Sequence, residues 1–209
     1  MTRGASAALI SVVAVAAGIA LAVLPRAPEP LPLDPEKLRR ARMAEDLMAG
    51  RGAIGGPFTL TDHHGTRRSL KDFRGKVVLL YFGFSYCPDV CPTDLAEIAA
   101  LLRSLGPRAA EVQALYVTVD PERDTPAQLS GYVTAFDPRI IGLTGSVEEI
   151  RGVATRYKAF FEKVPTERGY LMAHSANFYV IDREGKFAGS LPLGTKADRL
   201  ADVVRERLG

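Results

Sequence analysis

The sequence predicts an α/β fold in which a central mixed sheet lies between helices, preceded by an N-terminal transmembrane helix. A continuous apolar run from Val77 to Phe82 is typical of a strand buried on both faces. A strand–helix–strand order surrounds this run, and a hairpin pattern stands near the C-terminus. A parallel unit first and an antiparallel pair last indicate a mixed sheet between helices.

Hydrophobic period and turn residues define the other elements in chain order. We predict strands over 58–60, 112–119, 176–181 and 187–190, and helices over 92–105, 126–136, 147–157 and 197–208. We predict that 63–65 is a turn and that 142–145 is a loop. This order of elements is typical of a thioredoxin-like architecture.

Composition limits the function classes. The chain has 209 residues, of which 47% are hydrophobic and 24% are charged, as in an ordinary globular protein. The net charge of +3 and the lack of a dense basic stripe argue against a nucleic-acid partner. Two cysteines cannot form a disulfide-rich scaffold.

The N-terminus has the pattern of a membrane anchor. The twenty residues from Ala5 to Leu24 carry no charge, which is long enough to cross a bilayer. We therefore predict an anchor over 1–25, although Ala20 to Ala22 also fits the cleavage site of a signal peptide. The basic residues that follow would keep the domain in the cytoplasm by the positive-inside rule. That orientation conflicts with the chemistry described below.

A stiff spacer follows the anchor. Five prolines lie between Pro25 and Pro35, and a charged helix is expected from Glu36 to Ala49. We therefore divide the chain into the anchor at 1–25, a spacer and charged stalk at 26–54, and the globular domain at 55–209.

The cysteine pair carries the chemistry. Cys87 and Cys91 follow the buried strand, at the end of a sheet where α/β folds bind ligands. Pro92 places Cys91 near the helix N-cap, where the partial positive charge favours a thiolate. Three residues separate the cysteines, whereas thioredoxin-type enzymes have two. The pair can close a disulfide or chelate one ion.

His174 is the best candidate for a third ligand. It precedes the strand of the predicted hairpin, where thioredoxin-like folds hold a proline beside the cysteine pair. Taken alone, His174 would be read as a surface histidine. Two thiolates and one imidazole form a soft donor set that suits Cu(I), or Cu(II) with a further ligand. Structural zinc normally has four protein ligands, and Asp89, His63 or His64 could supply a fourth, although the two histidines are more simply read as exposed turn residues.

Asp120 ends a strand at the same edge of the sheet. It either shapes a turn or acts as a carboxylate that tunes the ion site without binding the ion.

At these residues the chain resembles the Sco/SenC family, the copper-binding assembly factors of cytochrome c oxidase. The resemblance covers residues 55–208 and rests on three stretches, which are Cys87 to Pro92, Val119 to Pro126, and His174–Ser175. It implies copper bound by Cys87, Cys91 and His174. It also implies a single N-terminal membrane anchor, with the domain in the periplasm or the mitochondrial intermembrane space.

Three functions remain open at this stage. The resemblance implies a copper chaperone that serves the copper-site subunit of the oxidase, with another copper chaperone or a thiol reductant as a further partner. Alternatively, Cys87 and Cys91 form the redox pair of a thiol–disulfide oxidoreductase, so whether the protein is an enzyme stays undecided. The third alternative is a redox or copper sensor.

Overall fold

The computed structural model describes residues 34, 38, 54–167, 169–175 and 177–209. The chain divides into two compact units, Met1–Leu38 and Arg39–Gly209. In the first unit the Leu38 amide donates to the Asp34 carbonyl at 3.0 Å. Within the described residues, no helix is long and apolar enough to cross a bilayer. The predicted anchor and nearly all of the predicted stalk lie outside those residues.

A seven-stranded mixed sheet forms the centre of the second unit, in the order β2-β1-β5-β4-β3-β8-β9. The strands are β1 (Thr59–Asp62), β2 (Arg67–Ser69), β3 (Val77–Gly83), β4 (Val112–Thr118), β5 (Ile141–Thr144), β8 (Asn177–Ile181) and β9 (Phe187–Pro192). β3, β4 and β5 are parallel, and the pairs at both edges are antiparallel. The predicted mixed sheet is thus confirmed.

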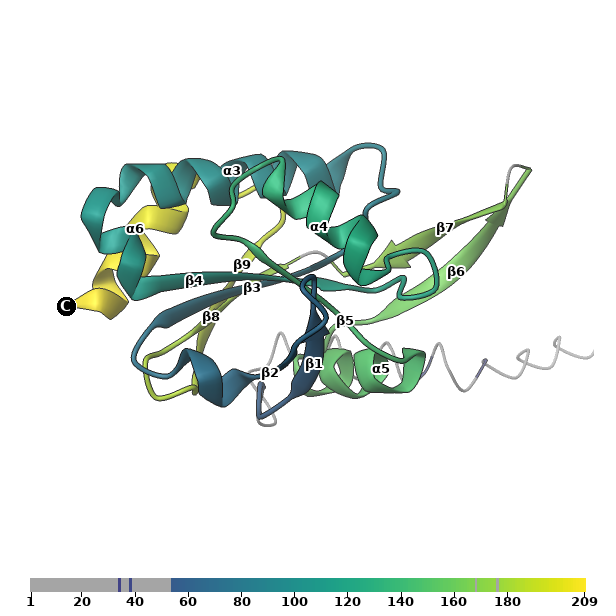
Figure 1. Cartoon of the computed structure of the whole chain (residues 1–209), viewed down its shortest axis with the longest axis horizontal. Helices are drawn as coiled ribbons and strands as arrows, with labels where there is room; N and C mark the ends of the chain where they lie inside the picture. Colours follow the sequence, from purple (N-terminus) through teal and green to yellow (C-terminus); the bar gives the residue numbers. More distant parts are fainter. Residues whose placement is uncertain (1–33, 35–37, 39–53, 168, 176) are drawn as a thin grey trace, which may run out of the picture. The chain divides into compact units, whose positions relative to one another are not determined.

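Helices cover both faces of this sheet (Figure 1). They are α3 (Val90–Ser104), α4 (Pro126–Thr134), α5 (Val147–Arg156) and α6 (Ala197–Leu208), with short 3₁₀ turns η1 (Leu70–Phe73) and η2 (Gly106–Glu111). Figure 1 shows α3, α4 and α6 above the sheet and α5 below it. Thr125 caps α4 and Ser146 caps α5, each accepting a hydrogen bond from a backbone amide of the first turn.

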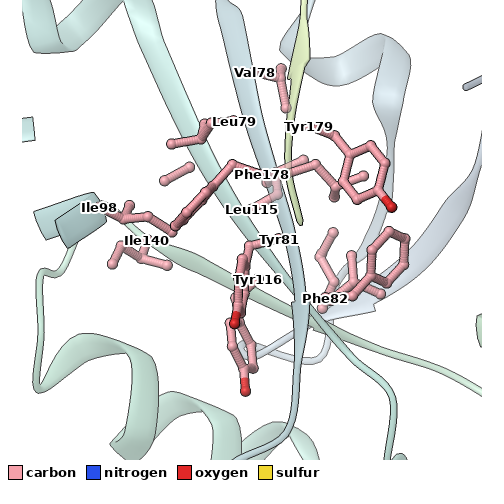
Figure 2. Packing of buried hydrophobic residues seen from close by; sticks show 14 of the residues in the cluster. Val78, Leu79, Tyr81, Phe82, Ile98, Leu115, Tyr116, Ile140, Phe178 and Tyr179 are labelled. Atoms are coloured by element: carbon pink, nitrogen blue, oxygen red, sulfur yellow. The ribbon is translucent and has the colours of Figure 1, made fainter. Parts of the chain in front are cut away.

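β3 is the most buried strand of the sheet. All seven of its residues are buried, as the continuous apolar run predicts. Tyr81 of β3 and Tyr116 of β4 stack with ring centroids 6.1 Å apart, and Figure 2 shows them side by side in the core. This core fixes the end of β3, from which the cysteine loop leaves.

Four strands were not predicted from the sequence, namely β2, β5 and the two strands of a second sheet. Residues 142–145 do not form a loop, because Ile141–Thr144 is β5, paired with β4 and β1. A second, two-stranded sheet was not predicted at all. It consists of β6 (Phe161–Thr166) and β7 (Gly169–His174), which project from the domain as a ribbon (Figure 1).

Candidate copper and thiol site

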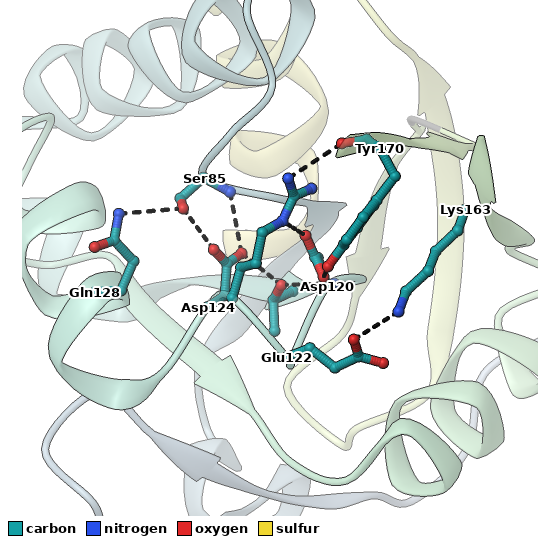
Figure 3. A network of polar contacts seen from close by, with 9 residues as sticks. Ser85, Asp120, Glu122, Asp124, Gln128, Lys163 and Tyr170 are labelled. Atoms are coloured by element: carbon teal, nitrogen blue, oxygen red, sulfur yellow. Dashed lines mark hydrogen bonds and ion pairs between the residues drawn. The ribbon is translucent and has the colours of Figure 1, made fainter. Parts of the chain in front are cut away.

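The cysteine loop is fastened to the sheet by a buried carboxylate. Asp124, in the loop between β4 and α4, accepts hydrogen bonds from the Ser85 amide at 3.0 Å and the Ser85 hydroxyl at 2.5 Å. The Thr118 hydroxyl at the end of β4 donates to the same carboxylate at 2.6 Å. Figure 3 shows Ser85 directed at Asp124. Because Ser85 lies two residues before Cys87, these bonds set the path of the loop that carries the thiol.

The two cysteines are unequal thiols, and both are free. Cys87 is partly exposed, whereas Cys91 is fully buried in the first turn of α3. Hydrogen bonding from the Cys91 side chain lowers the pKa of Cys87 to about 3, with further help from His174 and the Asp89 and Cys91 amides, against the effect of burial. The structure therefore presents Cys87 as the thiolate.

Cys91 behaves differently from the sequence-based expectation. Its hydrogen bond with the Cys87 side chain, followed by burial, raises the pKa of the Cys91 thiol well above its ordinary value. α3 begins at Val90, so Cys91 lies inside the helix rather than before it. The prediction that the helix N-terminus makes Cys91 a thiolate was wrong, because burial and the neighbouring sulfur outweigh the dipole.

His174 meets the cysteine pair. As the last residue of β7, it places Nε2 3.5 Å from the Cys91 sulfur. Its Nδ1 lies 3.1 Å from the Ser175 carbonyl oxygen. Because a carbonyl oxygen only accepts, Nδ1 carries a proton and donates it to Ser175, which leaves Nε2 as the ring nitrogen that faces the sulfur. The ring packs edge-to-face on Phe84, with centroids 5.7 Å apart.

Asp120 acts at a distance from the sulfurs. Its buried carboxylate accepts from Arg123 Nε at 2.5 Å and from the Tyr170 hydroxyl at 2.9 Å. Tyr170 lies on β7, the strand that ends at His174. Asp120 thus contacts the strand that carries His174, and among the described residues it has no hydrogen bond to either cysteine or to His174.

One possible fourth ligand, His63, is bonded to another part of the fold. His63 is buried rather than an exposed turn residue, and its Nδ1 accepts from the Gly142 amide at 2.9 Å. Burial is the main cause that lowers the pKa of His63. Among the described residues, no group of three or more His, Cys, Asp or Glu side chains already surrounds one ion position.

Sequence reasoning missed four residues that support the site. Phe84 and Ser85 support the imidazole and the cysteine loop, while Arg123 and Tyr170 link separate segments. The stretch from Val119 to Pro126 was a signal for Arg123 and Asp124. No local pattern marks Tyr170, because its role depends on an unpredicted strand.

Known proteins are similar to this chain in sequence. A family model described as SCO1/SenC matches residues 47–209. The mitochondrial SCO2 homologue of Bos taurus is 39% identical over 183 residues, which cover 85% of this chain and 69% of that protein. The mitochondrial SCO1 homologue 1 of Arabidopsis thaliana is 42% identical, over 78% of this chain and 49% of that protein.

Solved structures agree in fold. ScoI of Bradyrhizobium japonicum with copper bound is 44% identical, with a TM-score of 0.70 over 74% of this chain and 99% of that one. BsSco, described with a disulfide switch and as a member of the Sco family of cytochrome c oxidase assembly proteins, is 27% identical, with a TM-score of 0.63 over 74% of this chain and 94% of that one. The family match, which spans well over half of the sequence, and these relatives together show that the chain belongs to the SCO1/SenC family.

Proposed function

We propose that this domain binds one copper ion through Cys87, Cys91 and His174 and delivers it to the copper-site subunit of cytochrome c oxidase during assembly. The contact between the Cys91 sulfur and His174 Nε2 is the observation that carries the proposal. Two sulfurs and an imidazole suit Cu(I), and a further water or carboxylate would suit Cu(II). The copper-bound relatives support this choice of ion.

Exposure of the donors fits a transferable ion. Cys87 is reachable from solvent and already favours the thiolate, while Cys91 is buried behind it. An incoming ion would therefore meet the Cys87 sulfur first and displace the Cys91 proton as it binds the second sulfur. During transfer, the thiolates of an acceptor could replace the Cys91 sulfur first and the exposed Cys87 sulfur last.

Location follows from the same chemistry. We propose that the predicted anchor at 1–25 holds the domain on the outer face of a membrane, in the periplasm or the mitochondrial intermembrane space. A free dithiol there needs a metal or a reducing partner, because those compartments are oxidising. Mitochondrial relatives support a location of this kind.

Copper binding is tested by equilibrium dialysis and X-ray absorption on the full chain. We expect one copper with two sulfur neighbours and one imidazole nitrogen, and weaker binding in Cys87→Ser, Cys91→Ser and His174→Ala. His64→Ala is the matched control, since that ring lies at the turn after β1. Undiminished binding by all three site variants would overturn the proposal.

Thiol–disulfide exchange is the second candidate, favoured by the low pKa of Cys87 beside a protonated partner. Here the Cys87 thiolate attacks a disulfide of the oxidase subunit, and Cys91 then resolves the mixed disulfide. Two electrons pass to the target, whose two released sulfurs take one proton from Cys91 and one from solvent. His174→Ala separates the two functions. A reductase keeps most of its exchange rate in that variant, because Cys91 is the main cause of the low pKa of Cys87, whereas a copper donor loses its imidazole ligand.

A further inference from the structure

Arg123 lies between two aromatic rings from different parts of the fold. Its guanidinium carbon is 4.7 Å from the centroid of the Tyr86 ring and 3.9 Å from that of the Tyr170 ring. Stacking of a planar guanidinium on an aromatic face is favourable, and more so when solvent is largely excluded. Three quarters of the Arg123 side chain is shielded from solvent, since its exposed fraction is 25%.

The guanidinium is also oriented by hydrogen bonds. Nε donates to the Asp120 carboxylate and Nη1 donates to the Tyr170 carbonyl at 3.1 Å. The Tyr170 hydroxyl donates to the other oxygen of Asp120 at 2.9 Å, which closes the cluster (Figure 3). Such a fork geometry is specific to arginine, because a lysine ammonium has neither the plane nor the paired donors.

These contacts join the two sources of the copper donors. Tyr86 directly precedes Cys87 in the cysteine loop, and Tyr170 lies on β7 four positions before His174. Side chains alternate along a strand, so Tyr170 and His174 project from the same face of β7. A residue that holds Tyr170 against Tyr86 therefore also sets where the imidazole lies relative to the sulfurs.

Two neighbouring polar contacts each hold only one of the two segments, whereas the Phe84 ring packs on the His174 ring itself. Asp124 binds Ser85 and thereby fixes the cysteine loop. The Lys163–Glu122 ion pair of 2.6 Å ties the ribbon to the loop after β4, and both its side chains are largely exposed. Arg123 contacts the cysteine loop and the histidine strand at once.

We propose that Arg123 is a positioning residue that fixes the β6–β7 ribbon, and with it His174, against the cysteine loop. The inference rests on the proposed copper site, which it deepens. Loss of Arg123 would leave both sulfurs in place and free the imidazole, because the ribbon belongs to a sheet separate from β3 and α3.

The first experiment needs no metal. Hydrogen exchange of the reduced full chain is compared for wild type, Arg123→Gln and the control Arg151→Gln. Arg151 is the matched control because its guanidinium carbon lies 5.1 Å from the ring centroid of Phe161 at the start of the same ribbon, away from Tyr86 and Tyr170. In Arg123→Gln we expect exchange over β7 to rise about tenfold or more, with β3 and β4 unchanged.

The second experiment counts donors in the copper-loaded chain. X-ray absorption should show two sulfurs but no imidazole nitrogen in Arg123→Gln, and release of copper to a chelator should accelerate by about 10-fold to 100-fold. Arg123→Lys should restore only part of the effect, since it keeps the charge and loses the stacked plane. Arg151→Gln should match wild type in both measurements.

Several outcomes would overturn the inference. One is an Arg123→Gln variant with wild-type exchange over β7 and a retained imidazole ligand. Another is an Arg151→Gln variant that shows the faster exchange and the lost imidazole expected of Arg123→Gln. Should Arg123→Gln not fold, Tyr170→Leu removes the ring and hydroxyl from the other side, and wild-type behaviour of that variant also overturns the inference. A wild-type chain that binds no copper would instead overturn the proposed function, while the exchange result would still decide the role of Arg123.

Discussion

The Cys91 sulfur and the Nε2 atom of His174 lie 3.5 Å apart, although 83 positions separate these residues in the chain. The sulfur comes from a helix packed on the main sheet, and the ring comes from the end of a separate ribbon. The contact therefore depends on how the ribbon is held against the cysteine loop.

Cys87 should react selectively with alkylating agents at acidic pH. A thiol of ordinary pKa is ionised in only about one molecule in three thousand at pH 5, whereas the pKa of Cys87 is lowered to about 3. We expect iodoacetamide to modify Cys87 and spare buried Cys91, at a rate nearly constant from pH 5 to 8. Peptide mass spectrometry of the reduced, metal-free chain measures both sites.

Cys91→Ala provides the control for that experiment. It removes the largest cause of the low pKa of Cys87, so modification at pH 5 should slow markedly. A wild-type rate that climbs about tenfold with each pH unit would mean that Cys87 is an ordinary thiol.

Gly83 should not tolerate a side chain. A Cβ at this last residue of β3 would lie 2.7 Å from the hydroxyl oxygen and 2.8 Å from a ring carbon of buried Tyr116. Gly83→Ala should therefore lower the free energy of unfolding by about 1–3 kcal/mol, as measured by urea denaturation. Gly131 is the control, since it is exposed on α4 and a Cβ there would have no neighbour within 4 Å. The free energy of unfolding of Gly131→Ala should therefore rise by about 0.4–1 kcal/mol. Equal losses in both variants would refute the packing argument.

Asp124→Ala should destabilise the domain by about 2–4 kcal/mol, because it leaves buried donors of Ser85 and Thr118 without their acceptor. Denaturant unfolding measures the loss. Asp202→Ala removes only an exposed ion pair of 3.7 Å with Arg205 and should change stability by less than about 0.5 kcal/mol. A loss no greater than that of the control would show that Asp124 does not anchor the loop.

Asp137 should stabilise the fold at neutral but not at acidic pH. Its carboxylate accepts from Arg139 Nη2 at 2.6 Å, Nε at 2.8 Å and the backbone amide at 3.0 Å, and these bonds lower its pKa. A lowered pKa gives stability that is full above the ordinary value of 3.8 and disappears as pH falls through the folded-state value.

The corresponding variant is Asp137→Asn. We expect its free energy of unfolding to be about 1 kcal/mol below that of wild type at pH 7 and to approach wild type near pH 2. The expected loss is small because Arg139 is partly exposed, so solvent screens the ion pair. Thermal unfolding at several pH values measures the difference, with Asp198→Asn at the exposed start of α6 as control. A pH-independent difference would point to packing rather than charge.

The elements with a clear hydrophobic period were predictable from the sequence. The fully buried run of β3 and the apolar stripe of α3 were found at nearly the right residues, as were the hairpin strands β8 and β9. β5 was mistaken for a loop because it is short and contains Gly142. That glycine serves close packing, since a Cβ there would lie 3.1 Å from Leu129 Cβ of α4.

The candidate site was predictable only in part. The spacing of Cys87 and Cys91 predicts the thiol pair, and the position of His174 before a hydrophobic strand predicts the imidazole. The ribbon was missed because most residues of β6 are exposed or half-buried and show no alternating apolar pattern. The role of Arg123 could not be read from the sequence, because it depends on rings contributed by two other segments.

The ribbon's separation from the main sheet means that the three donors of the proposed copper site are not held with equal rigidity. β6 and β7 pair only with each other among the described strands, and at their base the Ser175 amide donates to the Phe160 carbonyl at 3.0 Å. Tilting the β6–β7 ribbon breaks no hydrogen bond between strands of the seven-stranded sheet. Displacing either sulfur, in contrast, would disturb α3 or the loop bound to Asp124. In the proposed copper site, we therefore expect the imidazole nitrogen to withdraw from a bound ion before either sulfur does.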